Sequence, residues 1–173
     1  GTQIMAEGYL EGAEVDVDVL VQGGAIKFHA FTDNFPTIEP FFVETGDAMP
    51  SRHESSDLDA VLKMAREVVA AIGLTDGALH LEAKIDARGP KLVELNARMG
   101  GDYLHDWIQT VWEVDLVEEA ARIATGLPCE PKRLKEARVH LVGKYLIPPR
   151  SGVISGLSAT VSKDPAKIHD LTL

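Results

Sequence analysis

The fold is decided by residues 77–101, G-A-L-H-L-E-A-K-I-D-A-R-G-P-K-L-V-E-L-N-A-R-M-G-G. Two runs with strand-like patterning, 78–85 and 91–95, flank the turn-forming sequence D-A-R-G-P, and this arrangement predicts a β-hairpin. Side chains two residues apart on a strand share a face, so Glu94 and Asn96 point the same way. A hairpin centred inside D-A-R-G-P places Glu82 directly opposite Glu94.

This opposition of two carboxylates needs compensation, because like charges facing each other across strands repel. Either one carboxyl is protonated or a cation lies between the two. Magnesium suits the second option, since it takes oxygen ligands and often uses one or two carboxylates together with substrate phosphates. Lys84 shares the face of Glu82, so an exposed Glu–Lys–Glu cluster without a metal is the alternative, and geometry alone does not separate the two.

The residues that follow favour a site that handles phosphates. Arg98 lies two positions beyond Asn96, and Gly100-Gly101 allows the backbone to approach a ligand closely. A carboxylate pair, an amide, an arginine and a glycine pair in one short stretch are typical of phosphoryl-transfer sites.

The same stretch resembles the metal-binding hairpin of the ATP-grasp ligases. That resemblance implies that Glu82, Glu94 and Asn96 hold Mg²⁺ or Mn²⁺. It also implies that Arg98 is catalytic and stabilises negative charge on the transferred phosphoryl group and the tetrahedral intermediate. A structural salt bridge from Arg98 to a neighbouring acid is the alternative.

A second stretch, E-G-Y-L-E-G-A-E at 7–14, resembles the adenine-binding hinge of the family. By that resemblance Glu7 accepts a hydrogen bond from the adenine amino group, and the backbone of Tyr9 and Leu10 binds the base edge. Glu14 would bind the ribose hydroxyls. Taken alone, an acidic strand edge that faces water would look similar.

The resemblance extends over roughly residues 5–145 and is greatest to the ligases that form carnosine. It implies that ATP activates a carboxylate as an acyl phosphate, which an amine then attacks, with β-alanine and L-histidine as the amino-acid substrates. Residues Glu44, Gly101 and Asp102 are expected near these substrates. The alternatives are a bacterial-type L-amino-acid ligase of other specificity, a non-catalytic ATP- and magnesium-binding regulatory domain, and a structural module with an acidic face.

The remaining pattern predicts an α+β fold in which helices flank an antiparallel sheet. Residues 14–21, E-V-D-V-D-V-L-V, alternate acids and valines as a half-buried strand does. Further strands are expected at 25–31, 41–43, 139–147 and 152–154, and helices at 55–72, 104–111 and 116–125. We expect residues 1–130 to be the C-terminal portion of an ATP-grasp domain and 131–173 to be a small C-terminal subdomain, which need not be complete.

Composition narrows the partners and the compartment. A net charge of −10, from 17 basic and 27 acidic side chains, argues against nucleic acid as a partner, although a metal ion could still recruit nucleotides. The single cysteine, Cys129, excludes a disulfide within the chain. With no signal-peptide pattern and no apolar run of ~18 residues, we expect a cytoplasmic protein that does not contact membranes.

One part of the family pattern is not found. ATP-grasp ligases also have an N-terminal domain, a glycine-rich loop and lysines that grip the phosphates, and none of these precedes Glu7. We therefore expect that an N-terminal ATP-grasp portion of the same protein is missing and that these 173 residues are inactive alone. The sequence leaves open whether the chain forms a homo-oligomer.

Overall fold

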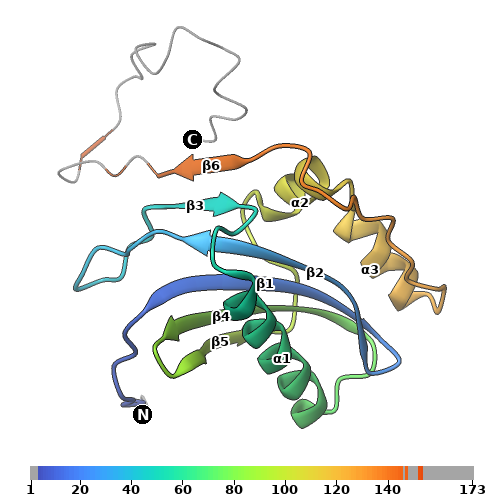
Figure 1. The fold of residues 1–173 in the computed structure, drawn as a ribbon, viewed down its shortest axis with the longest axis horizontal. Helices are drawn as coiled ribbons and strands as arrows, with labels where there is room; N and C mark the ends of the chain where they lie inside the picture. Colours follow the sequence, from blue (N-terminus) through green and yellow to red (C-terminus); the bar gives the residue numbers. More distant parts are fainter. Residues whose placement is uncertain (1–3, 146, 148–151, 154–173) are drawn as a thin grey trace, which may run out of the picture.

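The computed structural model describes residues 4–145, 147 and 152–153. This part of the chain forms one antiparallel sheet with the strand order β5-β4-β1-β2-β3-β6, together with helices α1 to α3 (Figure 1). The elements are β1 Ala13–Gln22, β2 Ala25–Asn34, β3 Gly46–Met49, α1 Ser55–Ile72, β4 Gly77–Asp86, β5 Gly89–Asn96, α2 Leu104–Trp112, α3 Leu116–Ala124 and β6 Leu141–Lys144. The α+β class with an antiparallel sheet flanked by helices is confirmed.

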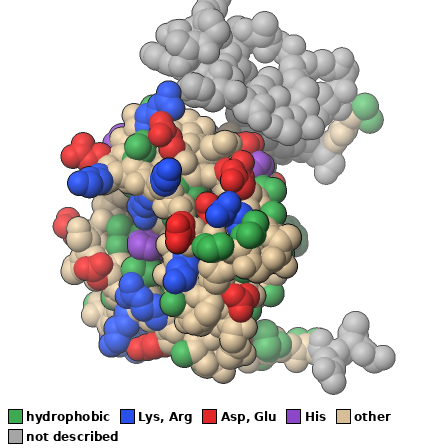
Figure 2. Space-filling model, turned by 90° about the vertical axis from the view of Figure 1, so that its right-hand side faces the viewer, with side chains coloured by type: hydrophobic (Ala, Val, Ile, Leu, Met, Phe, Trp, Pro, Cys, Tyr) green, Lys and Arg blue, Asp and Glu red, His purple; other side chains and the backbone are tan. Residues whose placement is uncertain are grey.

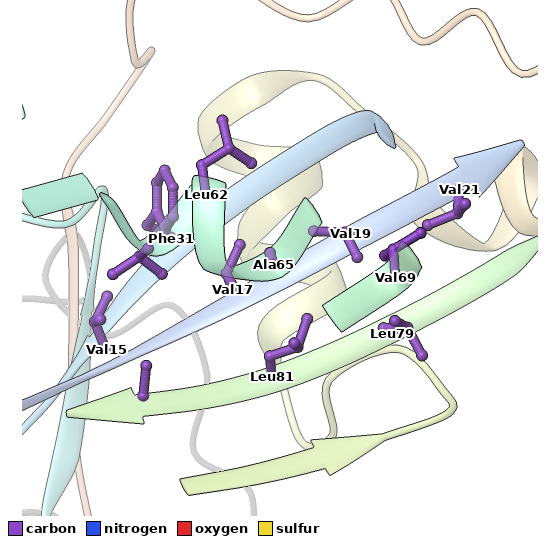
Figure 3. Close-up of a cluster of buried hydrophobic side chains, with 12 residues drawn as sticks. Val15, Val17, Val19, Val21, Phe31, Leu62, Ala65, Val69, Leu79 and Leu81 are labelled. Carbon is purple, nitrogen blue, oxygen red and sulfur yellow. The ribbon is translucent and has the colours of Figure 1, made fainter. Parts of the chain in front are cut away.

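One face of the sheet is covered by α1. The valines of β1 point toward this helix and pack with Leu79 and Leu81 of β4 against Ala65 and Val69 of α1 (Figure 3). The helix has the predicted bounds and ends at Gly73, which adopts the left-handed conformation that favours glycine at this position. Periodicity predicted this helix well because its buried positions recur at helical spacing.

The opposite face of the sheet is partly covered by α2 and α3, which agree with prediction to within a residue at each end. Leu20 of β1 and Phe28 of β2 pack there with Ile108 and Trp112 of α2. Acidic and basic side chains are interspersed on the side of the molecule that carries these helices (Figure 2). No helix in the described part of the chain is both long and apolar enough to cross a bilayer.

The strand β1 is buried more completely than its alternating pattern predicted. Asp16 and Asp18 are only 6% and 2% exposed, so the face that carries the acids does not face water. The half-buried interpretation was wrong because β1 lies inside the sheet, between β4 and β2, and because other parts of the chain cover its acidic face. Alternating acids and valines indicate that the two faces of a strand differ chemically, but they do not indicate which face contacts solvent.

The β4–β5 hairpin has the predicted Glu82–Glu94 pair, but with a shorter turn and a shift in register. Asp86 pairs with Gly89, so the turn is shorter than the five residues expected. Regular pairing from this turn would place Val93 opposite Glu82. The register shifts between Glu82 and Ala83, and this bulge restores Glu94 as the partner of Glu82. The predicted opposition of the two carboxylates is confirmed, and the simple register behind it is wrong.

The strand expected at 41–43 is also wrong. That segment forms only an isolated bridge between Ile38 and Val43, and Phe41 is 85% exposed. The third strand is β3 instead, which pairs with the end of β2 and with β6. The strand expected at 139–147 is shorter, and of the one expected at 152–154 the described residues 152–153 have no regular structure. The division at residue 130 stays a prediction.

Candidate active site

A cavity of about 120 Å³ opens on the acidic face of the sheet, beside the start of α2. It contains five of the residues predicted to form the site: Glu44, Glu82, Arg98, Gly101 and Asp102. Asn34, which with Asp33 was a candidate from the sequence to reach the amine substrate, also lines the cavity. The sequence did not point to the remaining lining residues, which are Asp16, Asp47, His80, Tyr103, Leu104 and Tyr145. The alternating acids of β1 were the available signal for Asp16, whereas Tyr145 follows a distant strand that no local pattern connects to the hairpin.

The pair formed by Glu82 and Glu94 has no lysine or arginine partner among the ion pairs of the described residues. Lys84, the proposed neutralising residue, lies 3.7 Å from Glu14 instead. The pKa of Glu82 is raised, first by burial and then by the charge of Glu94. The Glu–Lys–Glu alternative is therefore not what this hairpin forms, and no lysine or arginine between residues 4 and 145 forms an ion pair with either carboxylate.

These donors suit a hard divalent cation. Glu82 and Glu94 face each other, and Asn96 lies two residues further along β5, opposite His80. The side-chain nitrogen of Asn96 is buried without a hydrogen-bond partner in the described structure. No group of three or more His, Cys, Asp or Glu side chains in the described ranges is arranged as a metal site. Two carboxylates and an amide match Mg²⁺, which keeps other positions for phosphate and water.

His80 lies behind the carboxylate pair and is nearly enclosed. Its Nδ1 is 3.3 Å from Asp18 Oδ1, and its Nε2 is 3.6 Å from Asp16 Oδ2 and 3.9 Å from Glu82 Oε1. Burial lowers the pKa of His80, but the hydrogen bond and charge of Asp18, with the other two carboxylates, outweigh burial and raise it. Burial is the main reason that the pKa of Asp16 rises to about 8.

The other end of the cavity combines carboxylates with tyrosines. Tyr103 donates a hydrogen bond to Asp47, and the Tyr145 hydroxyl donates to Asp102 Oδ2 at 3.2 Å. The pKa of Glu44 is raised, first by burial and then by the charges of Asp47 and Asp102. This end is therefore strongly acidic and suits a cationic group.

The loop 98–102 carries the only Lys or Arg side chain that lines the described cavity, that of Arg98. Arg98 Nη1 donates to the carbonyl of Met99 at 2.9 Å, and Arg98 forms no ion pair among the described residues. The salt-bridge alternative for Arg98 is thus not seen. The backbone N–H of Gly100 donates to Asp18 Oδ1 at 2.6 Å, which joins the loop to the centre of the sheet.

The predicted nucleotide residues do not line this cavity. Residues 7–10 have no regular structure, and Tyr9 is 66% exposed, with its hydroxyl donating to Glu39 Oε1 at 3.1 Å. Glu14 lies on β1, where it accepts a hydrogen bond from Asn34 and pairs with Lys84. The roles of Glu7, Tyr9, Leu10 and Glu14 toward a nucleotide stay predictions.

Relatives of known sequence share much of the chain. The family model described as the ATP-grasp domain matches residues 1–106. Carnosine synthase 1 of Homo sapiens is 36% identical over 172 residues, which cover 98% of this chain and 20% of that protein. Carnosine synthase 1 of Gallus gallus is 36% identical over 177 residues, covering 99% and 19%. The chain thus spans about a fifth of the length of these curated relatives.

Solved structures of low identity share the fold. Phosphoribosylglycinamide synthetase from Anaerococcus prevotii superimposes with a TM-score of 0.76 at 16% identity, covering 91% of this chain and 41% of that one. An L-amino acid ligase from Bacillus licheniformis gives 0.61 at 21% identity, covering 71% and 31%. The family match spans more than half of the chain and the fold agrees with it, so this protein belongs to the ATP-grasp family.

Proposed function

We propose that the chain supplies the metal- and substrate-binding part of an ATP-dependent carboxylate–amine ligase. The observation that carries this proposal is the Glu82–Glu94 pair, which lacks a lysine or arginine partner among the described residues and lies on the strands that lead to Arg98. Glu82, Glu94 and Asn96 would hold Mg²⁺, which would neutralise the phosphates of bound ATP. The family membership supports ATP as the cosubstrate.

Arg98 has the electrostatic role in this proposal. Acyl transfer and phosphoryl transfer both concentrate negative charge on oxygen, and a fixed cation in a partly enclosed site stabilises that charge. The other charged groups that line the described cavity are carboxylates and His80. Arg98 is therefore the residue best placed to stabilise the charge that develops when a carboxylate is activated.

The acidic end of the cavity would bind the amine substrate. Glu44 and Asp102 repel a second carboxylate but attract an ammonium or imidazolium group, and Gly101 leaves room beside them. The similarity to carnosine synthase 1 supports β-alanine as the acid and L-histidine as the amine. A ligase for other L-amino acids is the second candidate, supported by the fold shared with the Bacillus licheniformis enzyme.

The nucleotide would lie along residues 7–10 and the start of β1. We propose that Glu7 and the backbone of Tyr9 and Leu10 contact the adenine, and that Glu14 contacts the ribose. Glu14 is adjacent to the cavity through Asn34, so a ribose held there would direct the phosphates toward Glu82. An adenine bound at 7–10 would also cover the exposed ring of Tyr9.

The first test measures binding of a non-hydrolysable ATP analogue to the 173-residue chain by calorimetry, with and without Mg²⁺. Glu94→Gln removes one charge from the pair and keeps its shape, so we expect magnesium-dependent affinity to fall by about tenfold or more, equal to at least ~1.4 kcal/mol. Glu67→Gln, on the exposed side of α1, is the matched control and should bind like the parent. Equal affinity of the Glu94→Gln variant and the parent would refute the metal-binding hairpin.

A second test asks for catalysis. Because the chain spans about a fifth of carnosine synthase 1, formation of the dipeptide is measured on the chain alone and on the chain joined to the preceding part of a carnosine synthase. We expect turnover only in the joined protein, with β-alanine and L-histidine preferred over other pairs. Magnesium-dependent nucleotide binding without turnover in either protein would favour a regulatory ATP-binding domain.

A further inference from the structure

We propose that Asp18 is a positioning residue, whose buried carboxylate holds the backbone of Gly100 and thereby places the 98–102 loop beside the metal-binding hairpin. Asp18 lies near the middle of β1 and does not line the cavity. Its consequence for ligand binding rests on the proposed function. The contact with Gly100 stands independently of that function and is tested separately.

The environment of Asp18 is costly for stability. The residue is 2% exposed, and its Oδ2 has no hydrogen-bond partner in the described structure. Its Oδ1 accepts from Gly100 N–H at 2.6 Å and lies 3.3 Å from His80 Nδ1. A buried polar atom without a partner disfavours the folded state, so the unpaired Oδ2 offsets part of what the contacts of Oδ1 contribute to stability. Asp18 is thus better explained by the loop that it holds than by stability.

Gly100 is shaped to receive this carboxylate. A Cβ at this position would lie 2.7 Å from Leu104 Cδ1 and 2.9 Å from Asp18 Oδ2. Its backbone is outside the left-handed region, so the close approach is what requires a glycine here. Asp18 and Gly100 are therefore matched: the acid fills the space that any larger residue at 100 would need.

The contact acts on the residues of the loop that face the cavity. Gly100 lies midway between Arg98 and Asp102, and both side chains line the cavity with Gly101. Beyond the loop, the amide of Leu104 donates to the carbonyl of Gly101 at 3.1 Å, where α2 begins. Asp18 thus fixes the loop from the sheet while α2 fixes it from the far side. A shift of Gly100 would displace Arg98 relative to Glu82.

The test uses two substitutions of Asp18. Asp18→Asn keeps an oxygen that can accept from Gly100, whereas Asp18→Val replaces the carboxylate by an apolar group of similar size. The control is Thr32→Val, which changes a residue 1% exposed on the neighbouring strand whose hydroxyl has no partner in the described structure. For each protein we measure the amide proton shift of Gly100 by NMR, the magnesium-dependent affinity for a non-hydrolysable ATP analogue, and the melting temperature.

We expect Asp18→Val to move the Gly100 amide proton upfield and to weaken binding by about tenfold or more. Its melting temperature should also fall, because the Gly100 N–H and His80 lose their partner. Asp18→Asn should keep most of the shift and lose less than about threefold in affinity. Thr32→Val should match the parent in the Gly100 amide shift and in the affinity for the nucleotide. Rescue by the amide distinguishes positioning from a general loss of stability.

Two results would overturn the proposal: an unmoved Gly100 resonance in Asp18→Val, or a moved resonance with parental affinity. If Asp18→Val does not fold, Gly100→Ala tests the contact from the other side with the carboxylate intact, and parental affinity in that variant overturns it equally. If the parent itself binds no magnesium nucleotide, the proposed function fails. The resonances of Arg98, Gly100 and Gly101 in Asp18→Asn and Asp18→Val still decide whether Asp18 places the loop.

Discussion

The three acids of β1 lie on one face of the same strand and yet have three different environments. Glu14 forms an ion pair with Lys84 at the edge of the cavity. Asp16 lines the cavity, and burial is the main cause that raises its pKa to about 8. Asp18 is sealed beneath the loop and binds Gly100. Three acidic side chains at alternate positions thus pair with a lysine, place a protonatable group beside the site and anchor a loop.

The residue-scale prediction concerns His29 and pH. Its pKa is lowered to about 4, first by burial and then by the charge of Arg133. In the unfolded chain His29 is protonated below about pH 6.5, whereas in the folded chain it stays neutral until about pH 4. The free energy of unfolding therefore decreases as pH falls from about 6.5 toward 4. Between pH 7 and pH 5 this loss should be about 1 kcal/mol, after allowance for partial exposure of the ring.

Urea unfolding of the parent and of His29→Gln at both pH values measures this effect. The glutamine variant should lose less stability between pH 7 and pH 5 than the parent does. His105→Gln is the control, because His105 on α2 has a side chain that is 43% exposed. An equal pH dependence in the parent and in His29→Gln would contradict the assignment.

At the scale of elements, the bulge in β5 decides what the hairpin can do. A tight turn between Asp86 and Gly89 gives the hairpin a stable end, but its regular register would place Val93 opposite Glu82. The shift beside Glu82 restores the carboxylate pair, and bulges frequently re-aim side chains next to active sites. The turn and the carboxylate pair thus require different registers of β4 against β5. One extra residue in β5 makes both registers possible in the same hairpin.

The element-scale prediction concerns the packing of α1 on the sheet. Ala65 is fully buried against the valines of β1, so a larger side chain would push the helix away. Ala65→Leu should lower the free energy of unfolding by about 1–3 kcal/mol. Ala70→Leu, at an exposed position of the same helix, should change it by less than about 0.5 kcal/mol. Urea titration of both variants checks this, and equal stability would show that α1 does not pack as described.

At the scale of the whole molecule, the cavity is assembled from segments that are far apart in sequence. β1 supplies Asp16, β4 supplies His80 and Glu82, and the 98–102 loop supplies Arg98. Tyr145 arrives only after the chain has passed through α2 and α3 and returned as β6 beside β3. The acidic end of the site therefore depends on the pairing of β6 with β3, which brings Tyr145 to the cavity.

The corresponding prediction concerns Arg133. This residue lies in the return segment, the stretch between α3 and β6, and contacts both α2 and the sheet. Its guanidinium lies 4.0 Å from the centre of the Trp112 ring, and its Nη1 donates to the His29 carbonyl at 2.7 Å. Arg133→Ala should destabilise the protein by about 2 kcal/mol, since it removes a cation–π contact and a charged hydrogen bond. Arg133→Lys should restore only part of this loss, because lysine lacks the planar fork.

Thermal unfolding followed by circular dichroism measures the three proteins. Lys135→Ala, two residues away and exposed, is the control that should melt like the parent. A melting temperature of Arg133→Ala equal to that of the parent would show that the return segment is held by other contacts.

Local patterns in the sequence predicted most of the elements. Helical spacing marked α1 to within its observed bounds, and the glycines and turn formers marked the hairpin, because these signals depend on neighbouring residues alone. The exposed segment 41–43 was mistaken for a strand because apolar β-formers occur there, although the sheet pairs residues 46–49 instead. A strand forms only where another strand pairs with it, and the local sequence does not show which segment that will be.

For the site, the sequence alone determined the chemistry of the hairpin: two acids and an amide on adjacent strands, with an arginine and a glycine pair in the loop that follows. Only the tertiary structure decided that Lys84 turns to Glu14, that Asp18 is buried beneath Gly100, and that Tyr145 closes the acidic end. Side-chain direction along a strand follows from a two-residue period, so it can be read locally. Burial and charge pairing depend on which distant segment covers a face, and that is settled only when the whole chain folds.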